Sequence, residues 1–233
     1  MKRIIILIFI SLATIGIKAQ NQPLITVGVG YPVFLSTKSD DAHYDYFINK
    51  KNYNLYLEKQ LKFLKQIPEI SITPGLAFTH ITENYDYEGL GGGGKGDYKH
   101  KAFSGFVKVL YEIERQPEIA TDYYFGIQVG YYFSSKTDGS RSSWQMNPDG
   151  GNYTNSEEID KSGEDFFHSN YIGLIAGIAP LGDKKTFIKP KIELGFYPAF
   201  ATVNSYFVNG EEKKNMLQIS ISADIGTKKK KAK

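Results

Sequence analysis

Apolar and polar residues alternate along this chain with a period of two. The clearest stretch is 123–133, where large apolar residues occupy one set of positions and smaller or more polar residues the other. The first set comprises Tyr123, Phe125, Ile127, Val129, Tyr131 and Phe133, and the second Tyr124, Gly126, Gln128, Gly130 and Tyr132. Successive side chains of a β-strand face opposite sides. The stretch is therefore predicted to form a strand with one apolar face and one small or polar face.

This alternation returns eight times and predicts strands at about 23–36, 52–65, 69–82, 100–114, 121–135, 168–181, 186–200 and 215–227. Short turns around 65–69, 115–119 and 181–184 alternate with long polar stretches at about 37–51, 83–99, 136–167 and 201–214. Short turns at one end, long loops at the other and apolar outward faces are typical of outer-membrane barrels. We therefore predict an all-β fold, an antiparallel eight-stranded up-and-down transmembrane β-barrel.

The stretch 52–65 fits this pattern least well. Leu57, Leu61 and Leu64 also suit one face of a helix, and a strand would turn Lys59 toward lipid. A lysine costs about 2–4 kcal/mol at the bilayer midplane and close to nothing near the interfaces. Either Lys59 extends to the interface or a bulge shifts the register. We expect a strand, because a missing one would leave an unpaired edge in lipid.

The N-terminus carries the marks of a secretory leader. Lys2 and Arg3 precede the apolar run 4–10, and a small residue, Ala19, stands before Gln20. These features predict a signal peptide at 1–19, cleaved before Gln20, ahead of a barrel at 20–227. The chain contains no cysteine, which excludes a lipoprotein anchor and a disulfide framework.

The net positive charge of the chain comes from its two ends. The leader holds Lys2, Arg3 and Lys18 but no acid, so its removal lowers the formal charge from +3 to 0. Five of the remaining lysines lie in the tail at 228–233, which we expect in the periplasm, solvated or near anionic head groups. The body is then mildly acidic, and nucleic-acid binding is not expected.

The inward positions of the predicted strands carry charges of both signs. They are Glu58, Lys62, Lys108, Glu112, Lys189, Lys191, Glu193 and Asp224. An eight-stranded barrel has room for little beyond its own side chains, and buried charges must be paired. We interpret these residues as a closed ion-pair network, with a narrow conducting path gated by the same charges as the alternative. A charged lumen also argues against a soluble ligand-binding barrel.

The leader, the eight strands, the short turns and the aromatic-rich strand edges together resemble the small outer-membrane β-barrel proteins of the Bacteroidetes, in the OmpA/OmpX/OmpW-like group. The resemblance implies a location in the cell outer membrane. It implies outer-membrane lipid and lipopolysaccharide as partners, and another outer-membrane protein complex as a further one. The last strand departs from the group, because it runs through Ile225 into lysines without a terminal aromatic residue.

No catalytic signature stands out. Residues 89–96 come close to a phosphate-binding loop, but Gly96 occupies the place of the required Ser or Thr, which favours a flexible surface loop. His168 and Ser169 are adjacent and so face opposite sides of a strand, where the histidine cannot activate the serine. His43, His80 and His100 lack metal-ligand spacing. We predict no catalytic residue, cofactor or metal.

The stretch 136–167 is rich in acids and is predicted to be an extracellular loop that is solvated, or that holds a divalent ion or a surface ligand. Its large aromatic residues are candidates for binding a partner: Trp144, Tyr153, Phe166 and Phe167. The predicted function is that of a non-enzymatic barrel, structural or accessory to an outer-membrane complex. The alternatives are a narrow porin-like channel and a lipid-modifying enzyme.

Overall fold

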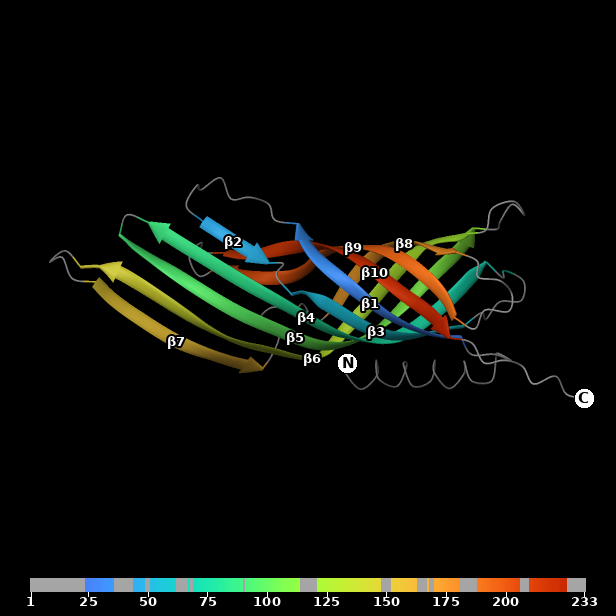
Figure 1. The fold of residues 1–233 in the computed structure, drawn as a ribbon, viewed down its shortest axis with the longest axis horizontal. Coiled ribbons are helices and arrows are strands. Elements are labelled where there is room, and N and C mark those ends of the chain that lie inside the picture. Colours follow the sequence, from blue (N-terminus) through green and yellow to red (C-terminus); the bar gives the residue numbers. More distant parts are fainter. Residues whose placement is uncertain are drawn as a thin grey trace, which may run out of the picture.

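The computed structural model describes residues 24–35, 44–48, 51–61, 67, 69–89, 91–113, 121–147, 152–162, 167, 170–180, 188–205 and 210–225. They form ten antiparallel strands (Figure 1): β1 Leu24–Leu35, β2 Tyr44–Ile48, β3 Tyr53–Gln60, β4 Ile70–Gly89, β5 Gly92–Ile113, β6 Thr121–Met146, β7 Asn152–Ser162, β8 Asn170–Pro180, β9 Ile188–Ser205 and β10 Gly210–Ile225. In this part of the chain, no helix is long and apolar enough to cross a membrane.

Eight of the strands close into a ring. Their order is β1, β3, β4, β5, β6, β8, β9 and β10, and β10 pairs with β1 to complete it. Every pairing is antiparallel, and Ile25 lies opposite Ile225, so the start of β1 and the end of β10 are side by side. The ring confirms the predicted fold, an all-β, antiparallel, up-and-down barrel of eight strands.

The two faces of the wall follow the alternation of the sequence. On β6, Phe125 and Val129 are about half exposed on the outside, whereas Tyr124, Gln128 and Tyr132 are buried inside. The same holds around the ring, where the exposed large hydrophobic side chains include Ile25, Val27, Val29, Leu55, Leu57, Leu76, Val109, Ile172, Leu174, Ile192, Leu194, Ile219 and Ile221. The barrel thus exposes an apolar outer wall and encloses a filled interior.

All four predicted long loops are wrong in part, because 83–99, 136–167 and 201–214 fold partly as continued strands and 37–51 contains β2. The stretch 83–99 forms the ends of β4 and β5, which pair as far as Gly89 and Gly92. The stretch 136–167 forms the end of β6 and the whole of β7, and β9 runs on to Ser205. A short strand, β2, also pairs with β4. We call β2, β7 and the outer parts of β4, β5 and β6 the extension, which projects beyond one side of the ring (Figure 1).

The doubtful second strand is β3, which pairs regularly with β1 and β4. Lys59 lies opposite Ile25, one residue from the start of β1, and no register shift interrupts this pairing. The lysine is therefore at an end of the barrel, where a long side chain can reach water. A bulge occurs instead on β6, where Phe133 is an extra residue between the partners of Phe103 and Ser104. Beyond this bulge, the outward positions of β6 change from odd to even numbers.

Candidate functional site in the barrel interior

A buried ion-pair triad crosses the lumen. Lys108 projects from β5, and its Nζ lies 2.8 Å from Glu58 Oε2 on β3 and 2.8 Å from Glu193 Oε1 on β9. All three side chains are at most 6% exposed. Tyr124 Oη donates to Glu193 at 3.4 Å, and the Lys108 ammonium lies 5.0 Å from the ring centre of Tyr56. One ammonium group thus joins walls from different sides of the ring and closes the lumen at this level.

The other predicted interior charges lie nearer the turns. Lys191 pairs with Asp224 at 2.8 Å, and the Thr26 hydroxyl donates to the same carboxylate. Glu112 accepts a hydrogen bond of 2.6 Å from the Gln60 side-chain amide. The backbone of Lys189 pairs with Asp224, but its side chain lies outside the described part, as does all of Lys62. Of the predicted residues, three thus meet in the triad and two in the Lys191–Asp224 pair, whereas Glu112 binds Gln60.

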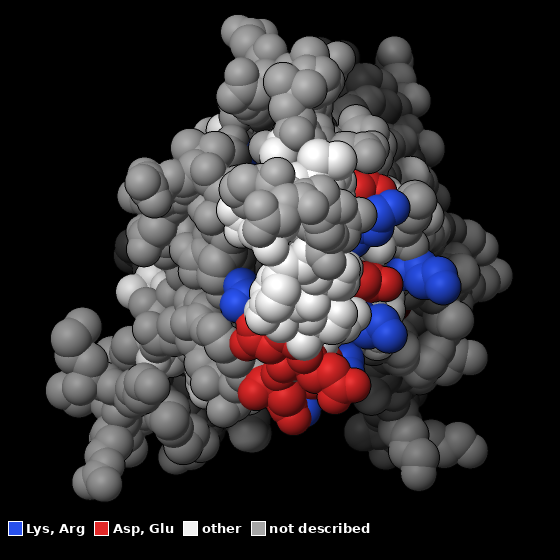
Figure 2. All heavy atoms as spheres, turned by 90° about the vertical axis from the view of Figure 1, so that its left-hand side faces the viewer, with Lys and Arg blue, Asp and Glu red and all other residues white. Residues whose placement is uncertain are grey.

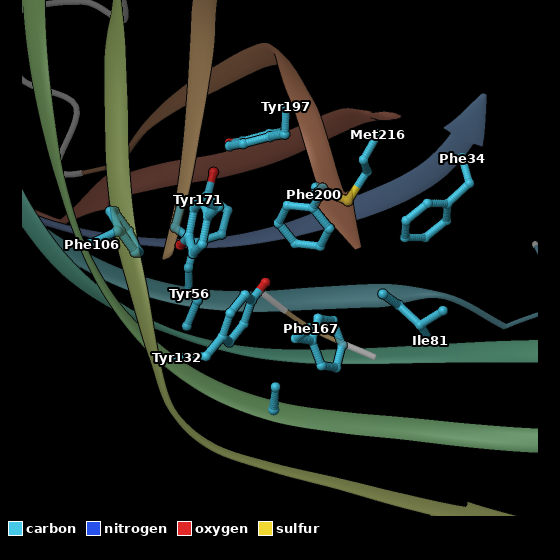
Figure 3. Close-up of a cluster of buried hydrophobic side chains, with 12 residues drawn as sticks. Phe34, Tyr56, Ile81, Phe106, Tyr132, Phe167, Tyr171, Tyr197, Phe200 and Met216 are labelled. Carbon is cyan, nitrogen blue, oxygen red and sulfur yellow. The ribbon is translucent and has the colours of Figure 1, made fainter. Parts of the chain in front are cut away.

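Above the triad, aromatic rings fill the lumen (Figure 3). Tyr171 lies 5.1 Å from Tyr132 and 5.4 Å from Phe200 between ring centres, within the range that aromatic pairs prefer. The Gln128 amide ties two tyrosines, donating to Tyr171 Oη at 3.2 Å and accepting from Tyr197 Oη at 3.1 Å. The cluster comprises Phe34, Tyr56, Ala77, Ile81, Ala102, Phe106, Tyr132, Phe167, Tyr171, Tyr197, Phe200 and Met216. These hydrogen bonds hold the two tyrosines against Gln128 of β6.

Inward glycines make room for these rings. A Cβ atom placed on Gly130 would lie 2.1 Å from the Tyr171 ring, and one on Gly28 would lie 2.2 Å from the Tyr56 ring. Real Cβ atoms do not approach ring carbons so closely. Each tyrosine therefore lies flat over backbone that only glycine leaves uncovered. This explains why glycine alternates with large apolar residues in the strand sequences.

The outer mouth of the barrel, the end next to the extension, holds a buried histidine. His100 Nε2 lies 2.8 Å from Glu83 Oε2, and its Nδ1 lies 2.9 Å from the Thr137 hydroxyl. Phe167 stands edge-on to the histidine ring at 6.5 Å and contacts Tyr132 at 4.8 Å. Among the described residues, no three His, Asp or Glu side chains gather in a way that could hold a metal ion. His100 thus packs against Phe167 at one end of the aromatic cluster.

The residues proposed to bind a partner separate into two places. Tyr153 on β7 is 70% exposed, and Trp144 on β6 is half-buried near the end of the same hairpin. Phe167 is only 2% exposed in the aromatic cluster, so it does not belong to that surface. Phe166, His168 and Ser169 lie outside the described residues. The glycines around Lys95, expected in a surface loop, belong to β5 instead.

The aromatic filling is the main feature that the sequence analysis missed. The inward faces were expected to be small or polar, yet Tyr56, Tyr132, Tyr171 and Tyr197 point into the lumen. A signal was available, because each tyrosine holds an inward position in a strand that also carries inward glycines or has glycines in a neighbouring strand. Pairing large and small residues across strands would have pointed to a filled interior.

No family model matches the chain, and no curated protein matches its sequence. Several solved structures resemble it, and three of them each cover 88% of the chain. They are the attachment invasion locus protein Ail of Yersinia pestis (10% identity, TM-score 0.39, 98% of that chain), the Neisserial surface protein NspA (8%, 0.44, 99%) and the outer membrane protein OprG from Pseudomonas aeruginosa (12%, 0.41, 93%). These identities and scores are low, and they describe a general likeness of shape.

Proposed function

We propose that this protein is an integral barrel of a bacterial outer membrane, exported by its leader, that acts as a non-enzymatic structural or accessory subunit through its extension. The outer wall supports the membrane placement. On β5, Phe103 and Ile113 are ten residues apart, which is about 34 Å along a strand and about 25 Å at the usual tilt. This matches the apolar band of such barrels, which is about 25 Å tall.

Aromatic contacts at both ends of this band support the same placement. Phe78 and Phe103 lie 4.9 Å apart between ring centres at the end near the extension, and Tyr111 and Phe125 lie 5.4 Å apart at the end near the turns. Transmembrane barrels carry such girdles of aromatic residues at the two interfaces. The extension then projects on the extracellular side.

The observation that carries the functional proposal is the closed lumen. The Glu58–Lys108–Glu193 triad and the aromatic cluster fill the interior at two successive levels. Separating the members of a buried ion pair leaves uncompensated charges in the interior, which is strongly unfavourable. A narrow porin-like channel is the less favoured alternative. We therefore assign the function of the protein to its outer surfaces.

The hairpin of β6 and β7 supplies the surface most suited to a partner. Tyr153 and Met146 are strongly exposed at its tip, whereas the rest of the hairpin is almost entirely polar. Trp144 and Met146 share one face of the hairpin, and Tyr153, opposite Gln145, lies on the other. Figure 2 looks at the extension from its far end and shows uncharged surface next to a group of acidic side chains. Exposed aromatic residues inside a polar rim are the usual anchors of protein interfaces. We assign the contact with an outer-membrane or surface complex to this tip.

Extraction of the tagged protein from its native membrane in mild detergent, followed by mass analysis of co-eluting proteins, tests the assignment. We expect a stoichiometric companion that is lost in a Trp144→Ala/Tyr153→Ala variant. The matched control is Asn155→Ala, an exposed polar change on the same hairpin. A barrel that elutes alone and conducts ions in planar bilayers would refute the proposal and favour the channel.

A further inference from the structure

Just beyond the apolar band, the outer face of the extension carries a row of basic side chains. We call His80, Lys101 and Lys136 the basic rung. The register places His80 opposite Lys101 on β5, and Lys101 opposite Lys136 on β6. His80 and Lys101 lie two residues beyond Phe78 and Phe103, so they share the lipid-facing side of the wall.

The height of the rung corresponds to the head-group layer. Two residues of an antiparallel strand rise about 7 Å. A bilayer of about 40–45 Å has a hydrocarbon core of about 30 Å, which leaves about 5–7 Å of head groups on each side. If the Phe78–Phe103 contact marks the edge of the core, the ammonium groups of the rung lie among the head groups.

With Lys99 included, three ammonium groups lie near two carboxylates on this face. Lys101 Nζ lies 3.1 Å from Asp138, and Lys136 Nζ lies 2.8 Å from Asp138 and 3.0 Å from Asp160. Lys99 is exposed on the same face, one step farther out, and no carboxylate of the described residues lies within ion-pair distance of it. Both aspartates occupy the outer step too, so they hold the two lysines from the side away from the membrane.

His80 lies in the electrostatic field of these lysines. Its buried Nδ1 has no hydrogen-bond partner among the described residues, and its ring lies 5.0 Å from that of Tyr53. The pKa of His80 is lowered, first by burial and then by repulsion from Lys101, Lys99 and His100. No carboxylate offsets this repulsion at the imidazole. An anion placed beside the rung would therefore be attracted by it.

We propose that the basic rung, together with Lys99, binds the phosphate groups of a phosphorylated glycolipid in the outer leaflet. The acyl chains would lie along the apolar wall below, against Phe78 and Phe103. Lysine ammonium groups bind phosphate oxygens through charge-assisted hydrogen bonds, and their flexible stems adapt to head groups of different shape. The inference rests on the proposed membrane placement and names the lipid that the wall would select.

Lipid retention in nanodiscs tests this site. The full-length protein is inserted into phosphatidylcholine nanodiscs that contain traces of bis-phosphorylated lipid A or of the same lipid after dephosphorylation. Lipid that stays bound is then counted by native mass spectrometry. We expect preferential retention of the phosphorylated form, reduced about fivefold by Lys99→Gln and more by Lys101→Gln/Lys136→Gln. The matched control is Lys95→Gln, an exposed lysine of the same strand farther from the membrane.

Lys99 is the decisive position, because its replacement breaks no ion pair of the described structure. Equal retention by wild type and Lys99→Gln, or equal retention of the dephosphorylated lipid, would overturn the site. Displacement of lipid A by inorganic phosphate, with phosphate bound in its place, would overturn the assignment to a lipid. A protein that does not insert at all would refute the membrane placement itself, whereas insertion without lipid preference refutes only the rung.

Discussion

Replacing Lys108 by methionine tests whether the ion-pair triad stabilises the folded barrel. Methionine keeps most of the length of the side chain but removes the ammonium group shared by Glu58 and Glu193. The two carboxylates, each at most 6% exposed, would then face one another without a counter-charge. Breaking a buried pair by removing one partner costs about 3–5 kcal/mol, and we expect a loss of this size in the free energy of unfolding.

Urea unfolding in liposomes measures this loss, followed by the band shift that a folded barrel shows on unheated gels. The triple variant Glu58→Gln/Lys108→Met/Glu193→Gln should recover most of the stability, because neutral amides no longer require a counter-charge. The control is Lys95→Gln, which breaks an ion pair that is 72% and 51% exposed and should cost at most about 1 kcal/mol.

Two results would refute this reasoning. A loss below about 1 kcal/mol for Lys108→Met would mean that water already reaches the carboxylates, so that the lumen is not closed at the triad. Steady conductance of the wild-type protein in planar bilayers, abolished or altered by the same substitution, would mean that the triad gates a path. We expect that neither the wild type nor Lys108→Met conducts ions in the bilayer and that Lys108→Met loses much of its stability.

Three further changes test the packing and the extension. Gly130→Val should cost about 1–3 kcal/mol or more in urea unfolding, because a Cβ at this position lies 2.1 Å from the Tyr171 ring. Phe167→Ala should cost about 3–5 kcal/mol by the same assay, because it empties a site beneath the outer mouth. The pKa of Asp138 is lowered, first by hydrogen bonds from Lys136 and then from Lys101. Its carboxylate therefore stabilises the hairpin above the unfolded pKa of about 3.9, and this contribution disappears as the pH falls through the folded value. Hydrogen exchange of the hairpin amides should accelerate there in the wild type but not in Asp138→Asn.

Each of these tests has a matched reference. Gly91→Ala adds a Cβ that meets nothing within 4 Å and should leave stability unchanged. The reference for Phe167→Ala is Tyr153→Ala, which removes an exposed ring from the hairpin of β6 and β7. If Tyr153→Ala lowered the free energy of unfolding by a similar amount, the assay would not report on the core. If the hairpin amides of Asp138→Asn and of the wild type exchange with the same pH dependence, the contacts of Asp138 with the lysines do not stabilise the extension.

The alternation of the sequence predicted the ring because the two faces of the wall meet different surroundings there. From Phe103 to Ile113, outward residues face one medium and inward residues a packed lumen, and a period of two results. Beyond Phe103 the outward residues are polar, and from His100 onward the inward face mixes polar residues and glycine with Tyr98. The pattern therefore stops although backbone pairing continues as far as Gly92. Hydrogen bonds between main chains leave no trace in side-chain polarity. The sequence pattern for this reason predicts loops where the extension forms.

The bulge at Phe133 connects the fold to both surfaces that the proposals use. A shift of one residue exchanges the faces of a strand. Without the extra residue, Lys136 rather than Thr137 would lie opposite His100, and its ammonium group would enter the buried mouth. With it, Thr137 reaches His100 at 2.9 Å, and Lys136 turns outward beside Lys101. One inserted residue thus keeps a charge out of the covered interior and completes the basic rung on the outer wall, so the closed lumen and the charged outer face depend on the same register.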